Sequence, residues 1–168
     1  MKLICGMLAA ASLAFVPGAA SAQGPEFASA PKLEFNHFMV AISVADMAAE
    51  TAFYRDVLDF TVESDVSLRG GATHFRWLTN GNQRIELVQV EGSQPGAEHP
   101  APPGHAAVRG FTHLTLETQD IEAVRDVLLS RGIMPALDIT EVAALGIKVM
   151  YVPDPEGNAI EIAQRSAA

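Results

Sequence analysis

The chain has 168 residues, about the size of one domain, so any functional site lies within one small unit or between copies of it. Hydrophobic residues make up 49% of the sequence and charged residues 18%, a composition that allows a packed core and excludes wholesale disorder. The net charge is −9, and a surface of that sign repels phosphate backbones, which argues against nucleic acid as a partner.

Residues 1–22 have the pattern of a secretory signal peptide. Lys2 precedes an apolar stretch, and the small residues Ala20-Ser21-Ala22 provide a cleavage site before Gln23. The apolar stretch is shorter than the roughly 20 residues that span a membrane, so we expect cleavage and no remaining membrane anchor. We therefore predict a secreted or periplasmic protein.

Regular structure is predicted from Phe35 onward, after a flexible leader at 23–34 that contains two prolines. In the first module, residues 35–90, the alternation of apolar and polar residues predicts a strand at 38–44 with Phe38 on its core face. Asp46 is a good N-cap for a helix. The predicted elements of this module are a strand at 38–44, a helix at 46–58 and strands at 61–66, 74–78 and 84–90.

The same order of elements recurs in a second module, residues 110–163, after a proline-rich linker at 91–109 that we expect to be exposed. Here Asp120 caps the predicted helix, and Gly132 ends it. The predicted elements are a strand at 111–118, a helix at 120–132 and strands at 133–139, 146–152 and 159–163. This duplication predicts an α+β fold made of two similar modules.

Three polar residues alternate with apolar neighbours on predicted strands, namely Glu86, His113 and Glu161. Alternation turns each of them away from the helix of its module. A single carboxylate in such a place is usually exposed to solvent, but these residues recur at equivalent places in both modules. Two carboxylates and an imidazole that converge would suit a divalent metal such as Zn, Ni, Mn or Fe(II).

The sequence resembles the vicinal oxygen chelate superfamily, which includes glyoxalase I, extradiol dioxygenases, epimerases and bleomycin resistance proteins. The segments that carry the resemblance are Val44-Ala45-Asp46, Phe53-Tyr54-Arg55-Asp56-Val57-Leu58, Ile85-Glu86-Leu87, Thr112-His113-Leu114 and Asp154-Pro155-Glu156-Gly157-Asn158-Ala159-Ile160-Glu161. The resemblance implies two βαβββ modules whose curled mixed sheets form an open cup. It also implies a divalent metal, a small-molecule substrate, and a possible homodimer. Glu86, His113 and Glu161 fall on metal-ligand positions.

The fourth ligand position is open between two residues. His113 stands seven residues before Asp120, and the matching residue before Asp46 is Met39, whereas His37 lies two residues earlier. A shift of two keeps the side chain on the same face but moves it about 6.6 Å along the strand. Either an irregular strand brings His37 to the metal, or three protein ligands suffice, or Met39 closes a pocket without metal. The predicted set of ligands is His37, Glu86, His113 and Glu161.

Three functions fit this pattern. The first is a lyase or isomerase similar to glyoxalase I, in which a metal polarises a carbonyl, Glu161 is the base and Glu86 its partner. Against it, export disfavours a glutathione adduct as substrate, and Glu50 and Asp59 depart from the glyoxalase pattern. The second is an Fe(II) dioxygenase of the extradiol type that uses His37, His113 and Glu161. The third is a protein that sequesters a small molecule without turnover, which Met39 favours.

The remaining histidines and aromatic residues are expected to be structural. His99 and His105 lie in the linker, where we expect them to be solvated. His74 begins a strand and is expected at the surface or along the cup. Phe53, Tyr54 and Trp77 are expected in the core or in the cup wall, with Tyr54 able to reach a ligand.

Overall fold

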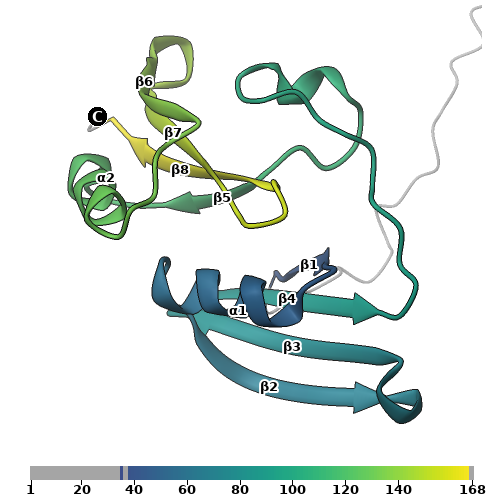
Figure 1. The fold of residues 1–168 in the computed structure, drawn as a ribbon. Helices are drawn as coiled ribbons and strands as arrows, with labels where there is room; N and C mark the ends of the chain where they lie inside the picture. The colour runs from purple at the N-terminus through teal and green to yellow at the C-terminus, as the bar shows by residue number, and fades with distance from the viewer. Residues whose placement is uncertain (1–34, 36–37, 167–168) are drawn as a thin grey trace, which may run out of the picture. The chain divides into compact units, whose positions relative to one another are not determined.

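A computed structural model describes Phe35 and residues 38–166, and all the helices and strands of this part lie in the unit Asn36–Ala168. The predicted signal peptide and leader lie outside the described residues. Two βαβββ modules follow each other along the chain (Figure 1). Module one contains β1 (Val40–Ser43), α1 (Met47–Asp56), β2 (Thr61–Leu68), β3 (Thr73–Asn80) and β4 (Gln83–Val90). Module two contains β5 (Leu114–Glu117), α2 (Ile121–Ser130), β6 (Leu137–Val142), β7 (Ile147–Pro153) and β8 (Ala159–Arg165).

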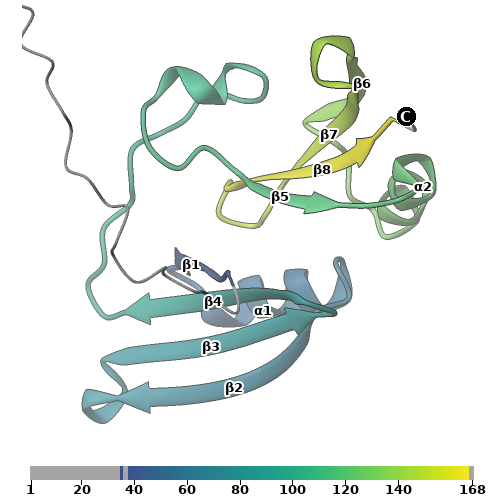
Figure 2. The same cartoon turned by 180° about the vertical axis from the view of Figure 1, so that it is seen from behind.

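Each module builds one open, mixed sheet of four strands. The strand orders are β1-β4-β3-β2 and β5-β8-β7-β6, and Figure 2 shows the four strands of the first sheet side by side with β2 at its edge. The first strand of each module runs parallel to the last, and the other neighbours are antiparallel. The helix supplies the crossover that a parallel pair requires. The predicted α+β class with two βαβββ modules and curled mixed sheets is confirmed.

The two helices begin at the predicted caps. The Asp46 carboxylate accepts hydrogen bonds from the backbone N–H groups of Ala48 and Ala49, both at 3.0 Å, and Asp120 accepts one from Ala123 at 2.9 Å. These bonds satisfy N–H groups that have no partner inside the helix. After α1 the chain turns through Asp59 in the left-handed region, with φ 57°, a conformation that glycine adopts with less strain.

One hydrophobic core contains residues of both modules. Its largest fully buried apolar side chains include Tyr54, Phe60, Leu78, Ile85 and Leu87 from module one and Ile121, Leu128, Met150 and Ile160 from module two. Full burial of a side chain of this size contributes roughly 1.5–3 kcal/mol. In β4 the buried Ile85 and Leu87 alternate with residues on the opposite face, called here the helix-free face of the sheet, and in β8 Ile160 and Ile162 flank Glu161 in the same way.

Polar contacts also join the modules. Arg131, just after α2, donates to the carbonyl oxygen of Val57 at 2.7 Å and pairs with Asp59 at 3.1 Å. The Glu156 carboxylate, in the turn between β7 and β8, accepts from the N–H groups of Ala45 and Asp46 at 2.6 and 2.9 Å. The turn of module two is therefore fixed to the start of α1.

Several expected boundaries differ from the structure. Phe38, expected on the core face, is 79% exposed, and β1 begins only at Val40. The strand expected at 133–139 is β6, Leu137–Val142, because Pro135 lacks an N–H group and the register with β7 starts at Leu137. The linker is not a simple exposed segment, since Gly104–Ala107 form a short 3-10 helix. No helix in the described part of the chain is long and apolar enough to cross a membrane.

Candidate functional site

Module two gathers polar side chains around Glu161 on β8. The strand register pairs Glu161 with Thr115 of β5 on one side and with Tyr151 of β7 on the other, so all three stand in one row on the helix-free face. The Thr115 hydroxyl donates to Oε2 of Glu161 at 2.8 Å, and the Tyr151 hydroxyl donates to Oε1. Only 12% of the Glu161 side chain is exposed. Two hydroxyl donors thus hold this carboxylate in one orientation.

His113, directly before β5, faces the same carboxylate. Its Nε2 lies 3.6 Å from Oε2 of Glu161, and its ring meets that of Tyr151 edge-on with centroids 5.5 Å apart. Burial raises the pKa of Tyr151, and the hydrogen bond to Glu161 raises it further, so the Tyr151 hydroxyl stays protonated and keeps donating at physiological pH.

His105 from the linker completes this cluster, contrary to the expectation that it is solvated. The side chain is buried, with 4% of the residue exposed, and its Nε2 lies 2.9 Å from Nδ1 of His113. Its ring also packs against Tyr151 with centroids 5.0 Å apart. Burial lowers the pKa of His105, and the nearby His113 lowers it further, so the ring is neutral at pH 7. His99 stays in the linker, with Nδ1 3.3 Å from the carbonyl oxygen of His105.

The corresponding row of module one is simpler. The register pairs Glu86 of β4 with Ala41 of β1 and Trp77 of β3. The Trp77 indole Nε1 donates to Oε1 of Glu86 at 2.6 Å. Arg84 lies over the Trp77 ring, 5.6 Å from its centroid, and pairs with Glu63 at 2.6 Å. Trp77 is 36% exposed, which places it in the wall of the helix-free face and not in the core.

The two rows share one plan. In each module the glutamate of the last strand, Glu86 or Glu161, accepts a hydrogen bond from an aromatic side chain directly opposite on the neighbouring strand, Trp77 or Tyr151. Where β5 offers a second hydroxyl donor, β1 has only the methyl group of Ala41. The sheet geometry of the site is therefore duplicated, but most of its polar groups are found in module two.

The same register identifies the residue equivalent to His113. Val40 and Leu114 hold the same place in the two parallel ladders, each paired with the residue before the glutamate. One step earlier stand Met39 in module one and His113 in module two. His37 lies outside the described residues. The described strand contains no irregularity that would shift this register.

A divalent metal, implied by the fold, fits part of this donor set. Two ligand atoms that each lie about 2.0–2.2 Å from one ion are roughly 3.0–3.5 Å apart, close to the 3.6 Å between Nε2 of His113 and Oε2 of Glu161. Within residues 38–166 and Phe35, no group of three or more His, Cys, Asp or Glu side chains is arranged to hold a metal ion. The four-ligand set with Glu86 and His37 therefore stays a prediction.

A second group of carboxylates lies where the modules meet. Glu50 of α1 is fully buried, and its Oε1 accepts the N–H of Glu156 at 3.0 Å. Burial raises the pKa of Glu50 to about 8, and the charge of Asp154 adds to the shift. Burial also raises the pKa of Asp154, although Asn158 donates two hydrogen bonds to it. The Tyr54 hydroxyl lies 3.4 Å from Asp154, in the core, so the idea that Tyr54 reaches a ligand is wrong.

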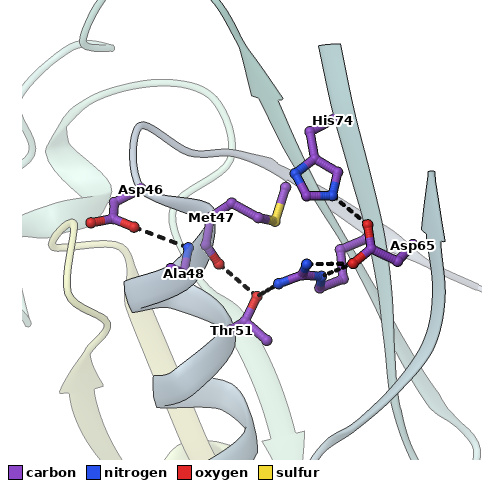
Figure 3. A network of polar contacts seen from close by, with 7 residues as sticks. Asp46, Met47, Ala48, Thr51, Asp65 and His74 are labelled. Carbon is purple, nitrogen blue, oxygen red and sulfur yellow. Dashed lines mark hydrogen bonds and ion pairs between the residues drawn. The ribbon is translucent and has the colours of Figure 1, made fainter. Parts of the chain in front are cut away.

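His74 takes part in a separate network on the helix side of the first sheet. Figure 3 shows its ring against the carboxylate of Asp65. Arg76 pairs with the same carboxylate and donates to Thr51 of α1 at 2.8 Å, while Thr51 donates to the carbonyl oxygen of Met47. The hydrogen bonds from His74 and Arg76 lower the pKa of Asp65. This network ties β2 and β3 to the helix and has no part in the candidate site.

Two residues of importance were missed by reasoning from the sequence. His105 lies in a segment without periodicity, and no local signal distinguishes it from the solvated histidine expected there. Glu50 did carry a signal, because it lies one turn after Met47 and one turn before Tyr54, on the buried face of α1. A carboxylate on the apolar face of a helix indicates either a partner or a raised pKa.

The sequence profile of the Glyoxalase/Bleomycin resistance protein/Dioxygenase superfamily matches residues 34–162. The chain belongs to this superfamily. The resemblance inferred from the sequence motifs is thereby confirmed.

Three similar proteins are each less than 30% identical to this chain. Methylmalonyl-CoA epimerase from Mus musculus mitochondria is 28% identical over 131 residues, which cover 77% of this chain and 71% of that protein. The structure is similar to that of a virulence protein from Salmonella typhimurium, with 28% identity and a TM-score of 0.53 over 80% of this chain and 99% of that one. It is also similar to a glyoxalase family protein from Enterococcus faecalis, with 23% identity and a TM-score of 0.60 over 77% and 96% of the two chains.

Proposed function

We propose that this superfamily member is a metal-dependent lyase or isomerase that moves a proton at a carbon next to a carbonyl group of a small substrate. The observation that carries the proposal is the setting of Glu161, a largely buried carboxylate that two hydroxyl donors orient and that faces His113 at 3.6 Å. A carboxylate fixed in this way, next to a metal-ligating histidine, is suited to act as a general base.

The name of the mouse relative supports this class of reaction. Epimerisation of methylmalonyl-CoA requires that a proton leaves the carbon between two carbonyl groups and returns on the other face. A pair of carboxylates suits such a reaction, since one can accept the proton and the other can supply it. Glu161 and Glu86 hold equivalent places in the two modules, and we assign them these two roles.

His113 and Glu161 would hold the metal, together with Glu86 and His37 in the predicted set. The metal, when bound, supplies a Lewis acid that polarises the carbonyl oxygen and acidifies the neighbouring C–H bond. Tyr151 and Thr115 keep the Glu161 carboxylate in place while it takes the proton. Trp77 has the same effect on Glu86 through its single indole N–H.

Proton exchange in D₂O tests the proposal directly. The protein is loaded in turn with Ni, Zn, Mn and Fe(II) and given methylmalonyl-CoA or the hemithioacetal of methylglyoxal with a small thiol. Loss of the α-proton signal is followed by ¹H NMR. We expect exchange with at least one metal and substrate, and a fall of about 100-fold or more in Glu161→Gln. Glu141→Gln, at an exposed residue of β6, is the matched control. Unchanged exchange in Glu161→Gln would remove Glu161 as the base.

The second candidate is a protein that sequesters a small molecule. Met39 supports it, because the register places this thioether where module two has His113. In that case neither substrate exchanges its α-proton with D₂O, whichever of the four metals is loaded. The same compounds bind to the protein equally well with and without a chelator. That result would replace the enzyme by the binding protein.

We also propose that residues 1–22 direct export and that the mature protein, secreted or periplasmic, begins at Gln23. The spacing of Lys2, the apolar stretch and Ala20-Ser21-Ala22 supports this. Mass spectrometry of the protein from a cell fractionation gives the new N-terminus, and an uncleaved protein in the cytoplasm would contradict export.

The possible homodimer is a separate proposal. Light scattering of the same sample gives the mass in solution and shows whether two copies associate.

A further inference from the structure

We infer that His105 is a positioning residue for His113: the linker between the modules supplies an imidazole that fixes which ring nitrogen of His113 faces Glu161. The inference rests on the proposed function only in so far as His113 is a metal ligand. It assigns a role in the site to a segment that lies outside both βαβββ modules.

The linker is anchored at this point by packing. His105 belongs to the short 3-10 helix Gly104–Ala107, and 4% of the residue is exposed. Its ring lies with its centroid 5.0 Å from that of Tyr151 and 5.1 Å from that of His113. A polar ring buried to this degree is costly unless it forms a hydrogen bond. The nitrogen that faces it, Nδ1 of His113, is 2.9 Å away and is suited to form that bond.

The hydrogen bond decides the tautomer of His113. Two neutral imidazoles at this distance share one proton, so one nitrogen donates and the other accepts. On the far side of the ring, the Glu161 carboxylate at 3.6 Å favours a proton on Nε2, which would block metal binding there. An acceptor at Nδ1 opposes this preference. With His105 accepting, the proton stays on Nδ1 and the Nε2 lone pair is free to bind a metal.

A second neighbour of Nδ1 provides a comparison within the chain. The Thr112 hydroxyl also lies 2.9 Å from this nitrogen, but it is partly accessible to water, and a hydroxyl can rotate to donate or to accept. The buried His105 ring is held by its packing and has less freedom. We therefore expect His105, and not Thr112, to determine the tautomer.

Three variants of the full chain separate hydrogen bonding from packing. His105→Gln keeps an acceptor near the position of Nε2, whereas His105→Phe keeps an aromatic ring against Tyr151 but has no acceptor. Thr112→Val removes the hydroxyl as the matched control. Thermal unfolding confirms that each variant is folded.

The first measurement is ¹⁵N NMR of the His113 ring in metal-free protein at pH 8. We expect the proton on Nδ1 in the unmodified protein, in His105→Gln and in Thr112→Val, and a shift of the proton to Nε2 in His105→Phe. The second measurement is titration with Zn or Ni. We expect His105→Phe to lose about 10- to 100-fold in affinity, and the other two variants to stay within about threefold.

Each outcome decides the inference. A proton on Nε2 of His113 in the unmodified protein overturns it without any variant, which covers the case in which His105→Phe does not fold. Equal losses in His105→Gln and His105→Phe overturn it too, because packing alone would then account for the effect. If the tautomer follows His105 but no variant binds metal, the positioning role stands and the proposed metal-dependent function fails.

Discussion

Glu50 makes the stability of the protein depend on pH in a predictable direction. The side chain is fully buried, and burial together with the charge of Asp154 raises its pKa to about 8 from the ordinary 4.5. In the folded protein Glu50 is therefore mostly protonated at pH 7, while in the unfolded chain it is ionised. Its contribution to stability is fully present below about pH 4.5 and is lost as the pH rises toward 8.

The size of the effect follows from the shift. A difference of one pKa unit corresponds to about 1.4 kcal/mol, so the free energy of unfolding should fall by roughly 3–4 kcal/mol between pH 5 and pH 8 because of Glu50. Glu50→Gln removes the ionisable group, and its amide oxygen can still accept the N–H of Glu156. The variant should be close to the unmodified protein at pH 5 and more stable at pH 8. Burial raises the pKa of Asp154 as well, so some pH dependence of the same sign remains.

Urea or thermal unfolding followed by circular dichroism between pH 5 and pH 9, at constant ionic strength, measures this difference. A gain of about 3 kcal/mol at pH 8 corresponds to roughly 10 °C in Tm for a domain of this size. Glu141→Gln, at an exposed position, should leave the pH profile unchanged. Parallel pH profiles of the unmodified protein and Glu50→Gln would refute the reasoning, whatever their absolute offset.

Three further predictions concern the candidate site. Tyr151→Phe removes a donor from Glu161 and should slow α-proton exchange about tenfold, measured by the D₂O assay, whereas Trp77→Phe should have the same kind of effect through Glu86. His113→Ala and Glu161→Ala should each lower Zn or Ni affinity at least 100-fold by calorimetry, and equal metal content in the unmodified protein and both variants would eliminate the site. Met39→His should raise metal affinity, because the register makes Met39 the residue of module one equivalent to His113. No gain with any of the four metals would favour His37 as the fourth ligand.

The fold could be predicted from local chemistry that repeats. Asp46 and Asp120 begin the two helices with the expected hydrogen bonds to backbone N–H groups. The alternation around Glu86 and Glu161 places both on the helix-free faces, as the sheet registers show. These features depend only on residues near in sequence, and that is why the pattern of residues was enough to predict them.

The details that escaped prediction depend on distant parts of the chain. His105 is buried because the linker packs on Tyr151, a contact between residues 46 positions apart in a segment without any regular pattern. Glu50 is buried because the turn with Asp154 and Glu156 lies against α1. Local periodicity carries no information on such contacts, and so the surroundings of the site were harder to predict than its sheets.

The two modules share one fold although they differ at two positions beside the site glutamates. Met39, directly before β1, and Ala41 of β1 stand where module two has His113, directly before β5, and Thr115 of β5. Neither Met39 nor Ala41 belongs to the shared core. A change of side chain at these two positions alters the polar groups of module one without opening a cavity in the core. Module two, by contrast, surrounds its glutamate with Tyr151 and the linker histidine. We therefore assign removal of the proton to Glu161. Glu86, which accepts one hydrogen bond from the Trp77 indole and lies beside Ala41, would return the proton to the substrate.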